Sequence, residues 1–131
     1  MTKRVAVVTD TTTHLGPDLA RELARRGHDL VVGDPCAGLV SELQALGSTV
    51  ESVSGVSDLA DPRSIETLMG QAVDRFGRVD SACIRTGSIT TGSVFDATVE
   101  DLRQQVAVNI ESVLYTLQTV LPPMLEAGSG Q

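Results

Sequence analysis

The stretch Arg-Val-Ala-Val-Val-Thr-Asp-Thr-Thr-Thr-His-Leu-Gly, residues 4–16, decides the fold. Its first half is apolar and rich in β-branched residues, which is typical of a strand that is buried on both faces. Leucines then recur four apart at positions 15, 19 and 23 while charged residues occupy the other side, and this spacing predicts an amphipathic helix. A buried strand that passes through a polar loop into a helix is the opening unit of a parallel sheet.

The same alternation continues along the chain. Apolar runs at residues 29–33, 49–53 and 79–84 predict three further strands, with helical spacing of the apolar residues between them. We expect the first helix to begin near Leu15 and end at Gly27, and the second to begin near Leu39 and end at Gly47. A third is expected over residues 62–76 with Asp61 as its N-cap. A long fourth helix is expected over residues 98–127, capped by Thr98 and Asp101. Pro122 and Pro123 should bend or interrupt the last turns of the fourth helix.

Four strand–helix repeats predict an α/β fold. We expect a Rossmann-like parallel sheet of order 3-2-1-4 with helices on both faces, lacking any strand after the fourth. Residues 1–131 would then form a single, partial domain. Ligands of such sheets bind beyond the carboxyl ends of the strands, here between the first and the fourth, so candidate site residues lie in the loops that follow the strands.

Charge and composition restrict the classes of function. The chain has 10 Lys and Arg against 17 Asp and Glu, a formal net charge of −7, which argues against nucleic acid or an anionic membrane as a partner. No apolar run approaches the roughly 20 residues of a membrane-spanning helix. Cys36 and Cys83 stand singly, so a metal site is unsupported, and reduced thiols fit a cytoplasmic protein.

Short motifs in the right order and spacing resemble those of the short-chain dehydrogenase/reductase family. The loop Thr9–Gly16 resembles its Thr-Gly-x-x-x-Gly-Ile-Gly element, with Asp10 and His14 in place of the first two glycines. Residues 80–87 resemble the stretch that ends in Asn-Asn-Ala-Gly, of which only Gly87 is kept. The resemblance covers the whole chain and implies the cofactor-binding half of an oxidoreductase that passes hydride between NAD(P) and an alcohol or carbonyl substrate.

The resemblance assigns Thr12, His14 and Leu15 in the first loop to cofactor binding, where a helix N-terminus can meet the pyrophosphate. The His14 side chain has two opposite interpretations. It could block the approach of the backbone to the pyrophosphate or, when protonated, donate to a phosphate oxygen. Asp10 adds a negative charge close to that position, and this charge opposes phosphate binding.

Asp34 ends the second strand, where the family reads the adenosine ribose. A carboxylate accepts hydrogen bonds from the ribose hydroxyls and repels a 2′-phosphate, so Asp34 followed by Pro35 favours NAD over NADP as the cofactor. The alternative is that Asp34 serves only as a turn residue at the end of its strand.

Three later positions complete the set that the resemblance implies. Asp58 and Leu59 follow the third strand and would lie beside the adenine, although Asp58 could simply start the next helix. Gly87 would border the cofactor. Asn109 is the catalytic residue of the set, through a water-mediated proton relay, and its position in mid-helix favours a specific hydrogen-bonding role. Arg85 is either a solvated loop charge or a phosphate contact.

The chain departs from the family in its catalytic residues. A serine and a Tyr-x-x-x-Lys motif are implied on and after a fifth strand, but the sole tyrosine, Tyr115, has Thr119 four residues on, and the sole lysine is Lys3. Residues 1–131 alone are therefore expected to be inactive, with the substrate undetermined. The alternative function is a non-catalytic Rossmann-like module that holds a nucleotide or associates with a partner.

The resemblance also implies a homo-oligomer, formed through helix 98–127 as in the family's dimers and tetramers. Without a fifth strand, the fourth would present an unpaired edge. The long helix would also expose apolar residues such as Val113, Leu117 and Val120.

Overall fold

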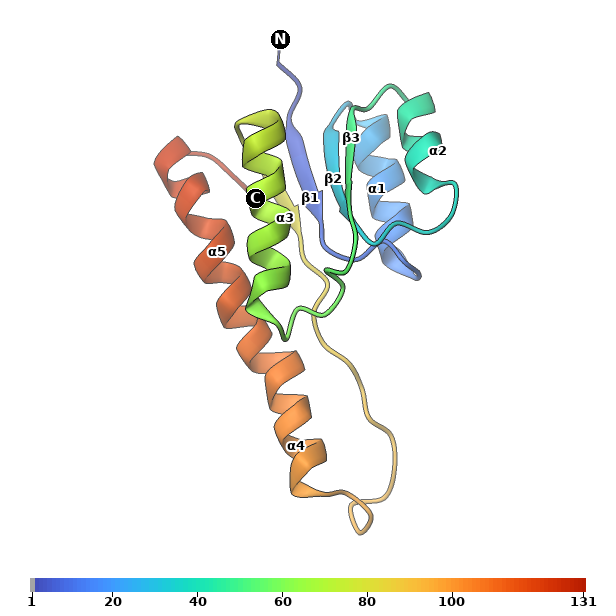
Figure 1. Cartoon of the computed structure of the whole chain (residues 1–131), viewed down its shortest axis with the longest axis vertical. Coiled ribbons are helices and arrows are strands. Elements are labelled where there is room, and N and C mark those ends of the chain that lie inside the picture. The colour runs from blue at the N-terminus through green and yellow to red at the C-terminus, as the bar shows by residue number, and fades with distance from the viewer. Residues whose placement is uncertain (1) are drawn as a thin grey trace.

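The computed structural model describes residues 2–131, and its elements follow the predicted alternation of strands and helices (Figure 1). The strands are β1 (Val5–Val8), β2 (Asp29–Gly33), β3 (Val50–Val53) and β4 (Ser81–Cys83). The helices are α1 (Leu15–Arg25), α2 (Leu39–Ala45), α3 (Pro62–Phe76), α4 (Val99–Val106) and α5 (Ser112–Ala127), with a π-helical segment, η1 (Ala107–Glu111), between the last two. All strand pairs are parallel and the order is β3-β2-β1-β4, as predicted.

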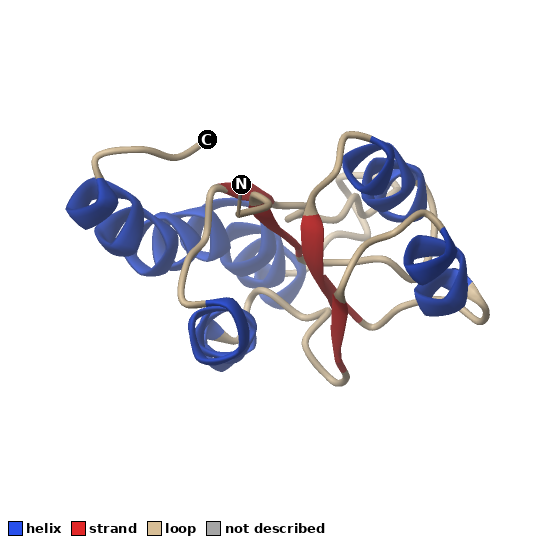
Figure 2. Cartoon of the chain, turned by 90° about the horizontal axis from the view of Figure 1, so that it is seen from above, coloured by secondary structure: helices blue, strands red, loops and turns tan. Residues whose placement is uncertain are grey.

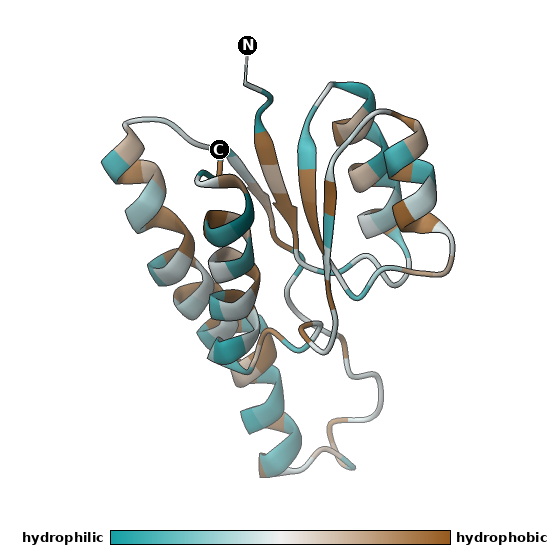
Figure 3. Cartoon of the chain, turned by 45° about the horizontal axis from the view of Figure 1, so that its top comes forward, coloured by the Kyte–Doolittle hydropathy of each residue, from teal (hydrophilic) through white to brown (hydrophobic). Residues whose placement is uncertain are grey.

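Helices cover both faces of the sheet (Figure 2). Ala6 and Val8 of β1 pack with α1 and α2, whereas Val7 points to the other face and packs with α3 and α5. This alternation buries all four β1 residues, so the strand is apolar along its whole length (Figure 3). The predicted Rossmann-like arrangement is confirmed, with an apolar core on each face of the sheet and with β1 and β4 paired side by side.

Local chemistry sets the starts of the later helices. The Asp61 carboxylate accepts from the backbone N–H of Arg63, and Pro62 occupies the first helical position, as predicted. Thr98 and Asp101 form a complete capping box, because each side chain accepts from the backbone N–H of the other residue. These caps fix where the chain turns from the loops into α3 and α4.

The predicted long helix over residues 98–127 is present, but it is not uniform. It widens in the middle into η1, which contains Asn109 and separates α4 from α5. Of the two effects predicted for Pro122 and Pro123, a bend or an interruption of the helix, the interruption does not occur, since α5 continues through both residues. Gln118, whose carbonyl loses its helical donor at Pro122, is exposed, so water can satisfy it.

The buried face of α5 also differs from the predicted apolar stripe. Val113 and Leu117 are exposed as predicted, but Val120 is only 4% exposed and packs in the core, so its predicted exposure is wrong. The hydroxyls of Ser112 and Thr116 donate to carbonyls four residues earlier, which lets polar residues face the core. The buried row is Ser112, Thr116, Val120 and Met124.

The open edge of the sheet is shorter and better paired than predicted. β4 occupies only three residues of the expected run 79–84. The N–H of Gln131 donates to the carbonyl of Asp80 at 3.0 Å, and the N–H of Ala82 donates to the carbonyl of Gln131 at 2.9 Å. These two bonds follow the parallel pattern, so the prediction of a wholly unpaired edge is wrong.

Candidate functional site

The loops that follow β1, β3 and β4 meet around a cavity of about 170 Å³ at the carboxyl end of the sheet. We call this cavity the crevice; its lining includes Asp10, Asp58, Leu59, Arg85, Gly87 and Val108. It lies at the switch point between β1 and β4, where the strand order predicts a ligand. Three of the predicted cofactor-binding residues, Asp58, Leu59 and Gly87, are thus brought together from loops far apart in the sequence.

The loop after β1 folds back closely on its own helix. A Cβ at Gly16 would lie 1.8 Å from the carbonyl oxygen of Asp10, so only glycine fits this approach. Thr11 is buried, and its hydroxyl donates to the carbonyl of Gly33 at 2.8 Å. The N-terminus of α1, with N–H groups that have no partner within the helix, is therefore held beside the end of β1.

His14 adopts a backbone conformation that glycine accepts more readily than other residues. Its φ of 58° and ψ of −128° lie where residues with side chains are rarely found, so this position carries backbone strain. The side chains of Thr12, His14 and Leu15 are all exposed. This loop can therefore present both its backbone and its side chains to a ligand.

Asp10 is 7% exposed, and its carboxylate is engaged on both oxygens. Oδ1 accepts from the N–H and the hydroxyl of Thr12, at 3.0 and 2.6 Å, and Oδ2 pairs with the guanidinium of Arg85. Burial would raise the pKa of Asp10, but the hydrogen bonds from Thr12 and Arg85 outweigh it and hold this pKa below its usual value. The carboxylate is charged at neutral pH, and Arg85 balances its charge.

Arg85 reaches from the end of β4 to the loop after β1. Its backbone N–H donates to the hydroxyl of Thr9 at 2.9 Å, and the N–H of Thr9 donates to the carbonyl of Cys83 at 3.1 Å. The sequence interpretation of Arg85 as a solvated charge or a phosphate contact missed this ion pair with Asp10. A signal was present, because both residues depart from the family pattern with opposite charge and follow strands predicted to be neighbours.

Asp34 lies outside the lining of the crevice. It has a left-handed φ of 46°, and its two carboxylate oxygens accept from the N–H groups of Gly55 and Val56, at 2.6 and 2.8 Å. Asp34 therefore ties the end of β2 to the loop after β3. Each carboxylate oxygen retains a second acceptor position, which is what a ribose hydroxyl would use.

Asp58 and Leu59 build the turn that leads into α3. Asp58 Oδ1 accepts from the N–H of Ala60 at 3.0 Å, and the carbonyl of Asp58 accepts from the hydroxyl of Ser64 at 2.7 Å. The Leu59 side chain is 4% exposed and belongs to the core, which leaves mainly its backbone to face a ligand. Both residues thus have a structural role beside the crevice.

Asn109 clamps the loop after β4 onto the π-helical segment. Its Nδ2 donates to the carbonyls of Ser88 and Gln105, at 3.1 and 3.0 Å, and its Oδ1 accepts from the N–H of Ser88 at 3.2 Å. A Cβ at Gly87 would lie 2.5 Å from Asn109 Oδ1. The two predicted residues are therefore in contact, at a helix irregularity of the kind that often marks functional sites.

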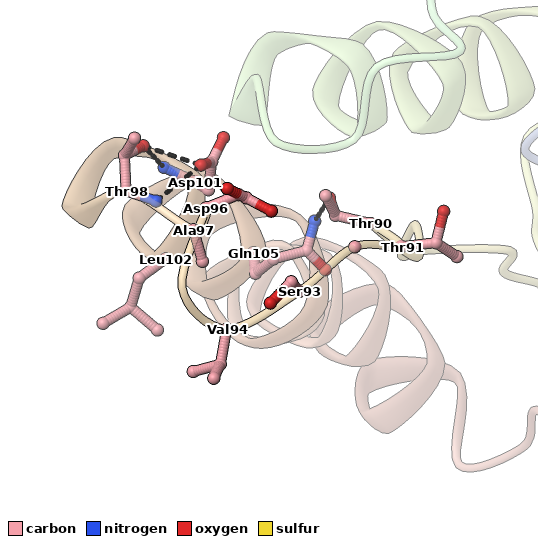
Figure 4. Close-up of a pocket in the computed structure, with 11 residues that line it drawn as sticks. Thr90, Thr91, Ser93, Val94, Asp96, Ala97, Thr98, Asp101, Leu102 and Gln105 are labelled. Carbon is pink, nitrogen blue, oxygen red and sulfur yellow. Dashed lines mark hydrogen bonds between the residues drawn. The ribbon is translucent and has the colours of Figure 1, made fainter.

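A larger cavity, of about 420 Å³, lies between the loop 90–98 and α4 (Figure 4). Gln105 Nε2 donates to the hydroxyl of Thr90 at 2.6 Å beside this cavity. The Asp101 carboxylate is already engaged, because it accepts from the N–H of Thr98 in the cap of α4. No predicted site residue lines it, and α4 extends beyond the end of the sheet (Figure 1). The crevice, and not this larger cavity, is the candidate site.

Residues 2–131 contain no group of three or more His, Cys, Asp or Glu side chains placed to hold a metal ion. Within the same described residues, no helix combines the length and the apolar character needed to cross a membrane.

The family model of the short chain dehydrogenases matches residues 4–131. The chain belongs to the short-chain dehydrogenase family. An uncharacterized NAD-dependent oxidoreductase of Mycobacterium tuberculosis is 30% identical over 142 residues, which cover 97% of this chain and 52% of the relative. The D-beta-hydroxybutyrate dehydrogenase of Rhizobium meliloti is 30% identical over 137 residues, which cover 100% of this chain and 52% of the relative.

Solved structures of short-chain dehydrogenases have the same fold. The actinorhodin polyketide ketoreductase, solved with NADPH, matches with a TM-score of 0.84 at 27% identity, over 98% of this chain and 51% of the ketoreductase. The chain therefore spans about half the length of the family members that it matches.

Proposed function

We propose that this chain is the cofactor-binding part of an oxidoreductase that transfers hydride between a nicotinamide dinucleotide and an alcohol or carbonyl group. The observation that carries the proposal is the loop between β1 and α1, which keeps the glycine-type turn at His14 and the close approach at Gly16 beside the crevice. When bound, the cofactor supplies the hydride acceptor or donor. The names of the relatives, one NAD-dependent and one a dehydrogenase of a hydroxy acid, support this class.

Three groups of residues at the carboxyl end of the sheet would each contact a different part of the cofactor. The N-terminus of α1 carries the positive end of the helix dipole and would hold the pyrophosphate, together with Thr12, His14 and Leu15. The adenosine ribose would contact Asp34. The adenine would lie near Asp58 and Leu59, and the remainder of the cofactor would border Gly87, which Asn109 holds in place. Asn109 would also take part in the proton relay.

The cofactor preference is the direct test of this arrangement. NAD(H) should bind the intact protein about tenfold or more tightly than NADP(H), about 1.4 kcal/mol, because the Asp34 carboxylate repels a 2′-phosphate. Titration with both cofactors measures the ratio. Asp34→Asn keeps a side chain that tolerates the left-handed backbone and should narrow the ratio, whereas equal or tighter binding of NADP(H) by the parent contradicts the assignment.

A second expectation concerns the activity of residues 1–131 on their own. Residues 1–131 alone should show no alcohol dehydrogenase activity with NAD, because Tyr115 has Thr119 and not lysine four residues on, so the tyrosine–lysine pair that the family uses for proton transfer is missing. An absorbance assay for the nicotinamide detects this. Turnover above background by these residues would disprove the expectation.

The outer face of η1 and α5, within the helical stretch 98–127, is proposed as a contact with a second copy of the chain. Leu117 is 45% exposed, and Leu114 and Leu121 of α5 and Ile110 of η1 are exposed as well. Apolar patches of this kind mark association surfaces. Sedimentation should reveal a dimer or larger species that Leu117→Glu weakens, and a monomer at high concentration would refute the contact.

A further inference from the structure

Two charged residues occupy the crevice where the family motifs have uncharged ones. Asp10 stands in place of the first glycine of the loop motif, and Arg85 stands within the stretch that resembles Asn-Asn-Ala-Gly. They are 75 residues apart in the sequence, yet the Arg85 guanidinium donates to the Asp10 carboxylate across the end of the sheet. The Arg85 side chain is still 44% exposed, so one part of it faces the crevice.

The ion pair removes the electrostatic repulsion that Asp10 alone would exert on an anionic ligand. An isolated carboxylate beside the N-terminus of α1 would oppose a pyrophosphate, and a nearly buried carboxylate is screened little by solvent. Arg85 cancels this charge without filling the crevice, because its backbone is anchored on Thr9 and its guanidinium lies against Asp10. Neither residue alone would leave this region neutral.

We propose that Asp10 and Arg85 act as one affinity-determining unit, in which Arg85 neutralises Asp10 so that the N-terminus of α1, beside the crevice, accepts the pyrophosphate of a dinucleotide. The proposal rests on the proposed function. It requires that single changes at the two positions act in opposite directions. Loss of Arg85 exposes the ligand to the Asp10 charge, whereas loss of the Asp10 charge frees a guanidinium that can donate to phosphate.

The test is a double-mutant cycle in the intact protein with Asp10→Asn, Arg85→Gln and both together, using NADH and inorganic pyrophosphate as probes. Arg85→Gln should weaken binding of both probes about tenfold, and Asp10→Asn should tighten it about threefold, with the double variant close to the parent. Circular dichroism checks that each variant is folded. If Arg85→Gln does not fold, the tightening by Asp10→Asn decides the test alone.

A second ion pair provides the matched control. Arg78 pairs with Asp80 at the opposite end of β4, far from the crevice along the strand. Arg78→Gln removes one arginine from the protein just as Arg85→Gln does, so the net charge changes equally. Its affinity for both probes should stay within about twofold of the parent, because long-range effects of a surface charge are screened at physiological salt.

The outcomes separate this proposal from the proposed function. Pyrophosphate binding that follows the expected pattern, with no NADH binding by any variant, supports the charge pair and rejects the dinucleotide as the ligand. Equal affinities of the parent, Asp10→Asn and Arg85→Gln, or no measurable binding of either probe by any of them, overturn the charge pair. An Arg78→Gln variant as weak as Arg85→Gln overturns it too, because net charge would then explain the effect.

Discussion

The two ends of the β1–β4 strand pair hold the same chemical group in different settings. At the amino end, Asp80 accepts from the N–H of Val5 at 2.8 Å and pairs with Arg78, two residues away in sequence. At the carboxyl end, Asp10 accepts from the N–H of Thr12 and pairs with Arg85, 75 residues away. Burial would raise the pKa of each aspartate, but the hydrogen bonds from Thr12 and Arg85 at Asp10, and from Arg78 and the N–H of Val5 at Asp80, outweigh it and lower both pKa values.

The difference between the ends lies in what surrounds the pair. The carboxyl-end pair lines the crevice beside the N-terminus of α1, where parallel sheets bind their ligands. The amino-end pair joins the start of β1 to the turn that precedes β4. We infer that an ion pair of one kind stabilises the sheet at both ends but bears on ligand binding only at the carboxyl end.

The close approach at the carboxyl end gives the largest expected effect. Gly16→Ala should lower the free energy of unfolding by about 3 kcal/mol, because its Cβ would collide with the carbonyl oxygen of Asp10. Gly70→Ala is the matched control in α3, where a Cβ meets no atom within 4 Å, and it should raise stability by about 0.5 to 1 kcal/mol. Urea unfolding measures both. Equal effects at the two glycines would contradict the geometry of the loop.

Acid unfolding compares the two aspartates directly. A carboxylate whose pKa is lowered by folding adds stability above its unfolded pKa, roughly 3.9, and this stability is lost as the pH falls through the folded pKa. Asp10→Asn and Asp80→Asn should each cost roughly 1 to 2 kcal/mol at pH 7, and the difference from the parent should shrink below about pH 4. Melting temperatures at pH 7 and pH 3 measure this change.

Glu66→Gln, at an exposed position of α3, is the control for a general loss of negative charge. A stability difference at Asp10 or Asp80 that is the same at pH 7 and pH 3 would contradict the role of the ionised carboxylates. If only one of the two Asp→Asn variants loses stability at pH 7, the two ion pairs do not contribute equally to the stability of the fold.

Backbone strain at His14 gives the smallest effect. His14→Gly should raise the free energy of unfolding by about 1 kcal/mol, because glycine adopts the φ of 58° without strain. It should also tighten nucleotide binding if the imidazole blocks the pyrophosphate. Thr13→Gly is the control, since Thr13 has no left-handed φ and glycine there only adds freedom to the unfolded chain. Stabilisation by both variants would show that the strain at His14 is not the cause.

The fold could be predicted where its signals are local. The apolar run of β1 predicts a doubly buried strand, and Asp61 with Pro62 and Thr98 with Asp101 mark helix starts within a few residues. The buried face of α5 could not be predicted in the same way. Ser112 and Thr116 are polar residues, which the sequence alone would place on the exposed face. Their hydroxyls donate to carbonyls of the same helix, and this allows both residues to be buried in the core.

The candidate site could be located from the sequence but not described in detail. Strand order and the family resemblance predict the switch point and bring Asp58 and Gly87 near it, because both lie in loops that follow the carboxyl ends of parallel strands, which share one side of the sheet. The Asp10–Arg85 pair depends on the relative positions of two loops, and its only sequence signal is that two residues of opposite charge depart from the family pattern after neighbouring strands. The hydrogen bonds of Asn109 likewise depend on the π-helical widening, for which the sequence carries no local signal.

Hydrogen–deuterium exchange of the intact protein with and without NADH tests the location of the cofactor most directly. We expect NADH to slow exchange in residues 10–16 and 85–88, which surround the crevice and the start of α1, and to leave residues 90–105 beside the larger cavity unchanged. Protection confined to residues 90–105, or no protection at residues 10–16 at saturating NADH, would contradict a dinucleotide site at the carboxyl ends of β1 and β4.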